Sequence, residues 1–308
     1  MKKLIAFFLV TMVLSCSTED RENQNVAPSA VSSESVLDGK LLSFKDEESF
    51  VKEYSALTEF KTVKELQDWV SKKKHSSFLN LKETSLDKED SIFDTSKIIY
   101  SDAIKAIFNS ESKVKINGNV IWLEGNKFYK LSGEDFDANV EELKQKEGEL
   151  EEYGTLYNGI QSEKNKTSRV VMPVVNGATV YYSNEAKGKR YNSVLFVESI
   201  GLGASRVVKL FLKSTADYRS CSFWRCRWKN DASLLRLVTI NVPFTVGNCE
   251  WSSSIQYGEV RNVVGEQTIL LATKNGVNTA PCALDVQIGL TGSIRTVGLS
   301  DYVWDLVL

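Results

Sequence analysis

The chain has 308 residues, of which 42% are hydrophobic and 25% charged, and its formal net charge is −2. This is the composition of an ordinary globular protein that is long enough to bury a sizeable core. Its single histidine excludes zinc or iron sites built on several histidines. The acidic residues at 87–94 are an alternative calcium site but lack the glycine of an EF-hand loop, and no metal or other cofactor is expected.

The first residues predict export. Lys2 and Lys3 precede an apolar run at 4–14, which is too short to span a bilayer and has the layout of a secretory signal peptide. The sequence VLSC at 13–16 resembles a bacterial lipobox, in which Cys16 is diacylated and becomes the first residue of the mature protein. Residues 1–15 are then the signal peptide. The alternative is an ordinary signal peptide that happens to contain a cysteine.

Residues 16–40 predict a flexible tether, because the segment is polar, rich in serine, asparagine and glutamate, and without apolar periodicity. Order is expected from 41 onward, beginning with two helices. Acidic residues at 46–48 suit the positive end of the first helix. Thr62 and Glu65 form a capping box that predicts the start of the second. Ser101 is a candidate cap for a third helix.

Three short strands with tight turns are expected next. Lys113–Ile116 and Val120–Leu123 are separated by Asn117 and Gly118, which is the strongest short hairpin signal in the chain, and Lys127–Leu131 follows a second turn. A further helix is predicted between Phe136 and Tyr153. The segment 41–160 is therefore expected to be an α+β domain, helical with a small antiparallel β-meander.

Charge and periodicity change together near residues 160–170. Residues 16–168 contain 30 acidic and 21 basic side chains, whereas residues 169–308 contain 10 acidic and 15 basic ones. Beyond 169 the apolar period becomes two, with seven or eight strand-like stretches and no helical one. This pattern predicts an antiparallel β-sandwich at 169–308. The positive charge indicates either solvated strand faces or a docking surface for an anionic partner.

The most distinctive strand is a candidate ligand-binding element. Phe223, Arg225 and Arg227 alternate with Trp224 and Trp228, so one strand face is cationic and the other aromatic. Exposed aromatic rings would suit stacking on sugars, and exposed arginines would bind carboxylate or sulfate groups. The alternative is that the tryptophans are core and the arginines only solvated.

Four cysteines remain once Cys16 carries lipid, and an exported chain meets oxidising conditions. Cys221 and Cys226 are an odd number of residues apart, so in one regular strand they point to opposite faces and cannot bond to each other. We therefore expect them to pair with Cys249 and Cys282. Free buried thiols are the alternative, and the spacing does not fit a zinc site.

No catalytic set is evident. His75 lies in the lysine-rich run SKKKHSS, and its neighbours predict exposure rather than a buried active site. Carboxylate pairs could perform glycoside hydrolysis, but the acidic residues occur in runs such as Glu141–Glu142 that are typical of solvated helix faces.

The order of these parts resembles a family of uncharacterised Bacteroidota lipoproteins. The resemblance is carried by the lipobox, the segment LLSFKDEESFVKEY, the helical pair, the segment IFNSESKVKINGNVIWLEGNKFYKL and the β-rich second half. It implies location and architecture, and no activity.

The expected function is that of a lipid-anchored outer-membrane protein, exposed at the cell surface, with a non-enzymatic binding or adhesion role. The periplasmic face of the same membrane is the alternative location. The membrane is the first partner, through the lipid, and a glycan or an envelope protein is the second; nucleic acid is not expected. The alternative function is glycan handling, either as a carbohydrate-binding accessory or as a carboxylate-based hydrolase.

Overall fold

A computed structural model describes residues 33–80, 100–158, 180–186, 188–222, 225–231, 235–247, 252–277, 285–288, 293–298 and 303–307. These segments belong to one compact unit, Ser32–Leu308. Cys16, Phe223, Trp224, Cys249 and Cys282 lie outside the described residues.

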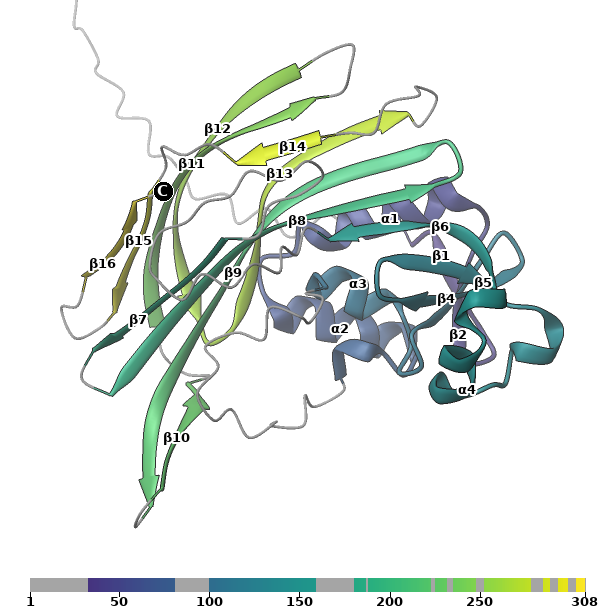
Figure 1. The fold of residues 1–308 in the computed structure, drawn as a ribbon, viewed down its shortest axis with the longest axis horizontal. Helices are drawn as coiled ribbons and strands as arrows, with labels where there is room; N and C mark the ends of the chain where they lie inside the picture. The colour runs from purple at the N-terminus through teal and green to yellow at the C-terminus, as the bar shows by residue number, and fades with distance from the viewer. Residues whose placement is uncertain are drawn as a thin grey trace, which may run out of the picture. The chain divides into compact units, whose positions relative to one another are not determined.

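The structure is mixed α+β, with few helices and a large, curled, mostly antiparallel sheet (Figure 1). Among the described residues this sheet has eleven strands, in the order β1-β2-β3-β4-β5-β6-β8-β9-β10, with β7 also on β8 and β13 also on β9. Only β2 and β3 pair in parallel within that part of the chain. The strands are β1 (Ser35–Asp38), β2 (Leu41–Phe44), β3 (Lys113–Ile116), β4 (Asn119–Glu124), β5 (Lys127–Lys130), β6 (Glu151–Asn158), β7 (Val180–Ala186), β8 (Lys189–Leu202), β9 (Ser205–Ser222), β10 (Arg225–Asn230) and β13 (Gln267–Val277).

A second sheet has five strands within the described residues, in the order β12-β11-β15-β16, with β14 also on β11. All of its pairings are antiparallel. Its strands are β11 (Leu235–Gly247), β12 (Ser252–Val264), β14 (Asp285–Ile288), β15 (Ser293–Gly298) and β16 (Val303–Val307). Face-to-face packing of the two sheets as a sandwich stays a prediction.

The helices cover the first part of the large sheet. Helices α1 (Glu47–Thr58), α2 (Val63–Lys73) and α3 (Asp102–Ile107) share one buried apolar cluster with strands β2 to β6, β8 and β9. Helix α4 (Val140–Gln145) packs on the other face, where its Leu143 joins a second cluster that contains Trp122 and Tyr129. Short 3₁₀ helices lie at η1 (Phe78–Asn80), η2 (Gly133–Asp135) and η3 (Glu147–Glu149).

The predicted helix starts are confirmed. The Asp46 carboxylate accepts a hydrogen bond from the Ser49 backbone N–H at the start of α1. Thr62 and Glu65 form the capping box of α2, and the Ser101 hydroxyl accepts from the Ile104 N–H at α3. Each cap satisfies a backbone donor that has no partner within its helix. Because the cap and the donor are only three residues apart, the local sequence was enough to predict where these helices start.

The three strands of the meander are confirmed, but the meander is not a small separate sheet. Strand β6 pairs with β5 on one side and with β8 on the other, so hydrogen bonds run across the composition change at 160–170. This continuity was not visible in the sequence, because a strand pattern does not state which neighbour the strand will pair with.

The helix predicted between Phe136 and Tyr153 is wrong over most of that range. Only α4 is α-helical, and β6 begins at Glu151. Leu150 packs on the α4 side of the sheet, whereas Tyr153 packs with the α1–α3 cluster. Leu150 precedes β6, and the pairing of β5 with β6 shifts register between Phe128 and Tyr129. Spacing that suits one helix face therefore serves two sides of a sheet here.

The end of the predicted tether is also ordered. Residues 35–38 form β1, which pairs with β2 through a turn at Gly39, whose φ is +64°. Val36 and Leu37 on this strand are exposed. Without an alternating apolar pattern the strand gave no sequence signal, although Asp38-Gly39 is a common turn dipeptide.

Candidate functional site

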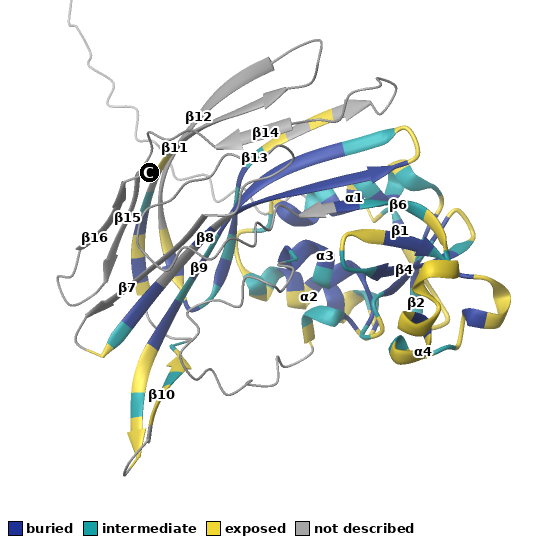
Figure 2. Cartoon of the chain, in the orientation of Figure 1, coloured by how far each residue is buried: buried dark blue, intermediate teal, exposed yellow. Residues whose placement is uncertain are grey.

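The β9–β10 hairpin contains the described part of the strand singled out from the sequence. Its strands pair in register from Asp217 opposite Asn230 to Ser222 opposite Arg225. Residues 218–230 contain four basic side chains and no acidic one. The hairpin is exposed, in contrast to the buried middle of β8 and β9 (Figure 2). It is therefore a positively charged, solvent-facing element.

The disulfide of this hairpin corrects the predicted pairing. Cys221 is bonded to Cys226, with the two Cα atoms 4.0 Å apart. The prediction treated both cysteines as members of one strand, but Cys221 lies near the end of β9 and Cys226 near the start of β10. Residues directly opposite each other in an antiparallel pair point to the same face, so the odd separation along the chain does not prevent the bond.

One face of the hairpin is cationic. Lys189, Tyr218 and Lys229 are directly opposite one another across β8, β9 and β10, so their side chains share a face. Ser220 and Arg227 form the next row toward the hairpin tip. We call these five residues the cationic face.

The cationic face is open to solvent. Tyr218 is 37% exposed, and Arg227 and Lys229 are also exposed. The Lys189 ammonium lies 5.7 Å from the centroid of the Tyr218 ring and 2.6 Å from an Asp231 carboxylate oxygen. The backbone of Arg225 continues the same face by its register opposite Ser222. Sequence reasoning missed Tyr218 and Lys189, because only the cross-strand register brings them beside Arg227.

The opposite face of the hairpin holds the described tryptophan. Trp228 is half-buried and lies opposite Arg219, with the guanidinium carbon of Arg190 4.6 Å from its ring centroid. Arg190 also donates to the Asp217 carboxylate at 3.1 and 3.2 Å. Trp228 is thus covered on one side by an arginine that is held in an ion pair, and the outward aromatic ring of the cationic face is Tyr218.

A buried polar cluster joins the helices to the large sheet. The Glu198 carboxylate has no exposed surface and accepts from the Tyr54 hydroxyl at 2.5 Å, the Ser101 hydroxyl at 2.6 Å and the Ser101 N–H at 2.9 Å. Lys209 lies opposite Glu198 in the strand register, donates to the Thr273 hydroxyl at 3.0 Å and lies 5.5 Å from the Tyr54 ring.

Burial governs the protonation of this cluster. Burial away from water raises the pKa of Glu198, and the hydrogen bonds from Ser101 and Tyr54 partly offset this rise. Burial also lowers the pKa of Lys209 to about 8. A catalytic carboxylate must reach its substrate, whereas every contact described for Glu198 is internal. The cluster therefore fits a structural role, tying α1 and α3 to β8.

His75 is buried, so the predicted exposure is wrong. Lys74 takes a left-handed conformation after α2, and the chain then turns inward. The His75 Nε2 atom lies 2.8 Å from the Ala106 carbonyl oxygen, and the ring meets Trp69 edge-on. Burial lowers the pKa of His75 below 6.5. Its described neighbours include no serine or cysteine nucleophile hydrogen-bonded to the ring.

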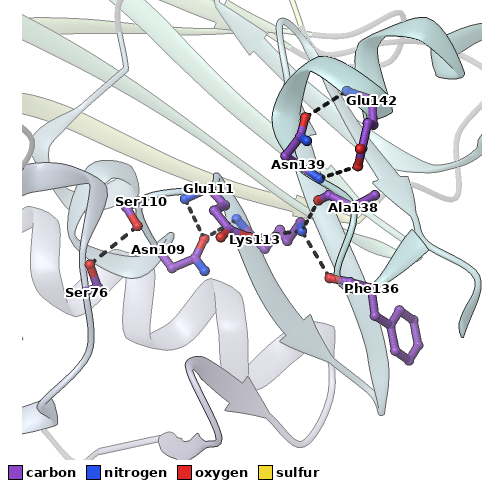
Figure 3. Close-up of polar contacts among 9 residues, drawn as sticks. All are labelled: Ser76, Asn109, Ser110, Glu111, Lys113, Phe136, Ala138, Asn139 and Glu142. Atoms are coloured by element: carbon purple, nitrogen blue, oxygen red, sulfur yellow. Dashed lines mark hydrogen bonds and ion pairs between the residues drawn. The ribbon is translucent and has the colours of Figure 1, made fainter. Parts of the chain in front are cut away.

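The acidic segment around α4 is a solvated surface, as its runs of glutamate indicated. Glu141 and Glu142 are exposed, and Glu142 accepts from the Asn139 N–H in a capping box. Lys113 on β3 ties the segment to the sheet. This lysine is 2% exposed and donates to the carbonyl oxygens of Phe136 and Ala138 at 3.0 and 2.6 Å (Figure 3).

The described residues contain no group of three or more potential metal ligands. Across the same residues, no helix is long and apolar enough to cross a membrane. Comparisons of the chain with models of protein families, with curated proteins and with solved structures found no match. The resemblance to Bacteroidota lipoproteins therefore stays a prediction.

Proposed function

We propose that this protein is a lipid-anchored outer-membrane protein with a binding or adhesion role, and that the cationic face of the β9–β10 hairpin holds an anionic partner. The lipobox at 13–16 supports the anchor, through Cys16. The observation that carries the binding role is the face itself. Exposed Lys229 lies opposite Tyr218 and exposed Arg227 is two residues along the same strand, with no acidic residue between 218 and 230.

Charge of one sign on a protruding element attracts an oppositely charged partner and raises its local concentration. Arginine binds carboxylate, sulfate and phosphate groups through two hydrogen bonds, and lysine adds a point charge. The disulfide between Cys221 and Cys226 restrains the hairpin, so less conformational entropy is lost when a ligand binds.

Contacts between the two sheets support the predicted sandwich at 169–308. The Arg236 side chain on β11 is 1% exposed and donates from Nη2 to the Ser214 hydroxyl on β9 at 3.2 Å. Its neighbour Val238, on the same side of β11, has no exposed surface. A buried row on the small sheet that bonds to the large sheet is the arrangement expected where two sheets pack face to face.

Two measurements test the proposed function. Protease shaving of intact cells, with mass spectrometry of the protein's N-terminus, should find the chain accessible from outside and Cys16 acylated. Binding of the chain from Ser17 onward to dextran sulfate, with neutral dextran as the control, should fall at least tenfold when Arg227 and Lys229 are both changed to alanine. An unmodified Cys16, or equal binding to both polymers, would refute the corresponding half of the proposal.

A further inference from the structure

The cationic face has a regular two-dimensional spacing. Neighbouring strands lie about 4.8 Å apart, and residues two apart on one strand lie about 6.8 Å apart. Lys189, Tyr218 and Lys229 therefore form a row across three strands, and Arg227 stands one step along β10 from Lys229. Arg225 occupies the next position of the same register. Positive charge is thus repeated along β10 rather than gathered at one point.

A repeated line of charge selects for an extended ligand. A compact anion contacts only the one or two cations nearest to it, because backbone positions on this face repeat about every 6.8 Å along the strand. A polymer with an acidic group on successive units can meet several, and the later contacts form at high effective concentration. The face is therefore matched to a polyanion that lies along β10.

Tyr218 adds an aromatic ring to the cationic face, which binding of an anion by charge alone would not need. The residue is 37% exposed at the centre of the row, with the Lys189 ammonium over its ring, 5.7 Å from the centroid. An aromatic face packs well against the flat apolar face of a sugar ring, and the tyrosine hydroxyl can hydrogen-bond at the same time. The Ser220 hydroxyl is two residues further along β9 on the same face. Hydroxyl groups beside a partly exposed ring suit a ligand rich in hydroxyl groups.

We propose that the cationic face binds an extended acidic polysaccharide, with one sugar ring stacked on Tyr218 and its carboxylate or sulfate groups bonded to Lys229 and Arg227. Lys189 is a positioning residue, because its ammonium is held between Asp231 and the Tyr218 ring. This inference rests on the proposed function and specifies the ligand class of the same site.

Direct binding to defined polymers tests the inference. The chain from Ser17 onward is suitable, because it includes all of the compact unit Ser32–Leu308. Isothermal titration at 50 and 200 mM salt would compare polygalacturonate, monomeric galacturonate, neutral dextran, dextran sulfate and vesicles containing anionic phospholipid. We expect polygalacturonate to bind at least 100-fold more tightly than its monomer, with weaker binding at the higher salt concentration.

Tyr218 variants separate stacking from charge. Tyr218→Ala should weaken polygalacturonate binding at least tenfold, whereas Tyr218→Phe, which keeps the ring, should stay within about threefold of the wild type. Lys229→Ala should weaken binding and reduce its salt dependence. Lys64→Ala is the matched control, since Lys64 is an exposed lysine on α2 that pairs only locally with Asp68. Circular dichroism of each variant checks that the fold is retained.

The outcomes distinguish this inference from the proposed function. If dextran sulfate binds but Tyr218→Ala has no effect on any acidic polymer, the site is a general anion site and the polysaccharide inference is overturned. Binding to anionic vesicles with no binding to polygalacturonate would also overturn it, and would identify a membrane surface as the partner. If none of the anionic probes binds, both proposals are wrong.

Discussion

At the scale of single residues, buried titratable side chains explain much of how this fold holds together. Glu198 and Lys209 are at most 1% exposed, and each keeps hydrogen-bond partners in place of water. Such groups stabilise only while all their partners are present, because an unpaired buried polar group costs about 1–3 kcal/mol. Their protonation states therefore make stability depend on pH.

His75 gives the simplest test, because it is the only histidine in the chain. Burial lowers its pKa below 6.5, so the folded protein keeps the ring neutral at pH values where the unfolded chain is protonated. Stability should therefore decrease as the pH falls below 6.5. In NMR, the single imidazole Cε1 proton signal should titrate with a midpoint below 6.5, and return to about 6.5 in urea. A midpoint at or above 6.5 in the folded protein would show that the ring is accessible to water.

Lys209 has the same direction of effect as His75, in an alkaline pH range. Its folded pKa is about 8, whereas the unfolded value is 10.5, so between these values the unfolded chain binds more protons and stability should rise with pH. The whole difference corresponds to about 3 kcal/mol. Urea unfolding at pH 7, 8, 9 and 10 should show the rise in the wild type and a smaller one in Lys209→Met. An equal rise in both proteins would assign the effect to other groups.

At the scale of elements, the β9–β10 hairpin depends on its disulfide. On a chain-entropy model, closing a loop this short restrains local opening of the hairpin by about 2 kcal/mol. Replacing Cys221 and Cys226 together by serine should therefore speed amide hydrogen exchange in β10, while the amides of β3 to β5 keep their protection. The thermal unfolding midpoint of the core should change little. Equal loss of protection in both regions would mean that the bond supports the whole fold.

The elements also show what the sequence could predict. Helix starts and the Asn117–Gly118 turn follow from residues within four positions of each other, and these predictions are confirmed. The Cys221–Cys226 bond and the cationic face depend on register between strands, which no local pattern states. The lysines before His75 wrongly predicted that this histidine is exposed, because the left-handed conformation of Lys74 turns the chain inward.

At the scale of the whole molecule, one sheet crosses the change in charge near residue 160. Strand β6 pairs with β8, and the Tyr54 hydroxyl on α1 donates to Glu198 on β8 at 2.5 Å. The apolar cluster of the helices includes Ile200, Leu202 and Val207 from beyond that change. Elements that share a sheet, a core and a buried polar cluster are expected to unfold together.

This coupling predicts a shared response to a single change in the buried cluster. Tyr54→Phe removes one donor from Glu198 without altering the packed ring, and should destabilise the protein by about 1–3 kcal/mol. If the segments on either side of residue 160 unfold as one unit, hydrogen exchange through global unfolding should speed up equally in β4 and in β9. Tyr100→Phe is a control, because its hydroxyl bonds to the Gly125 carbonyl within the first segment. Faster exchange in β4 alone after Tyr54→Phe would mean that the two segments unfold independently despite the shared sheet.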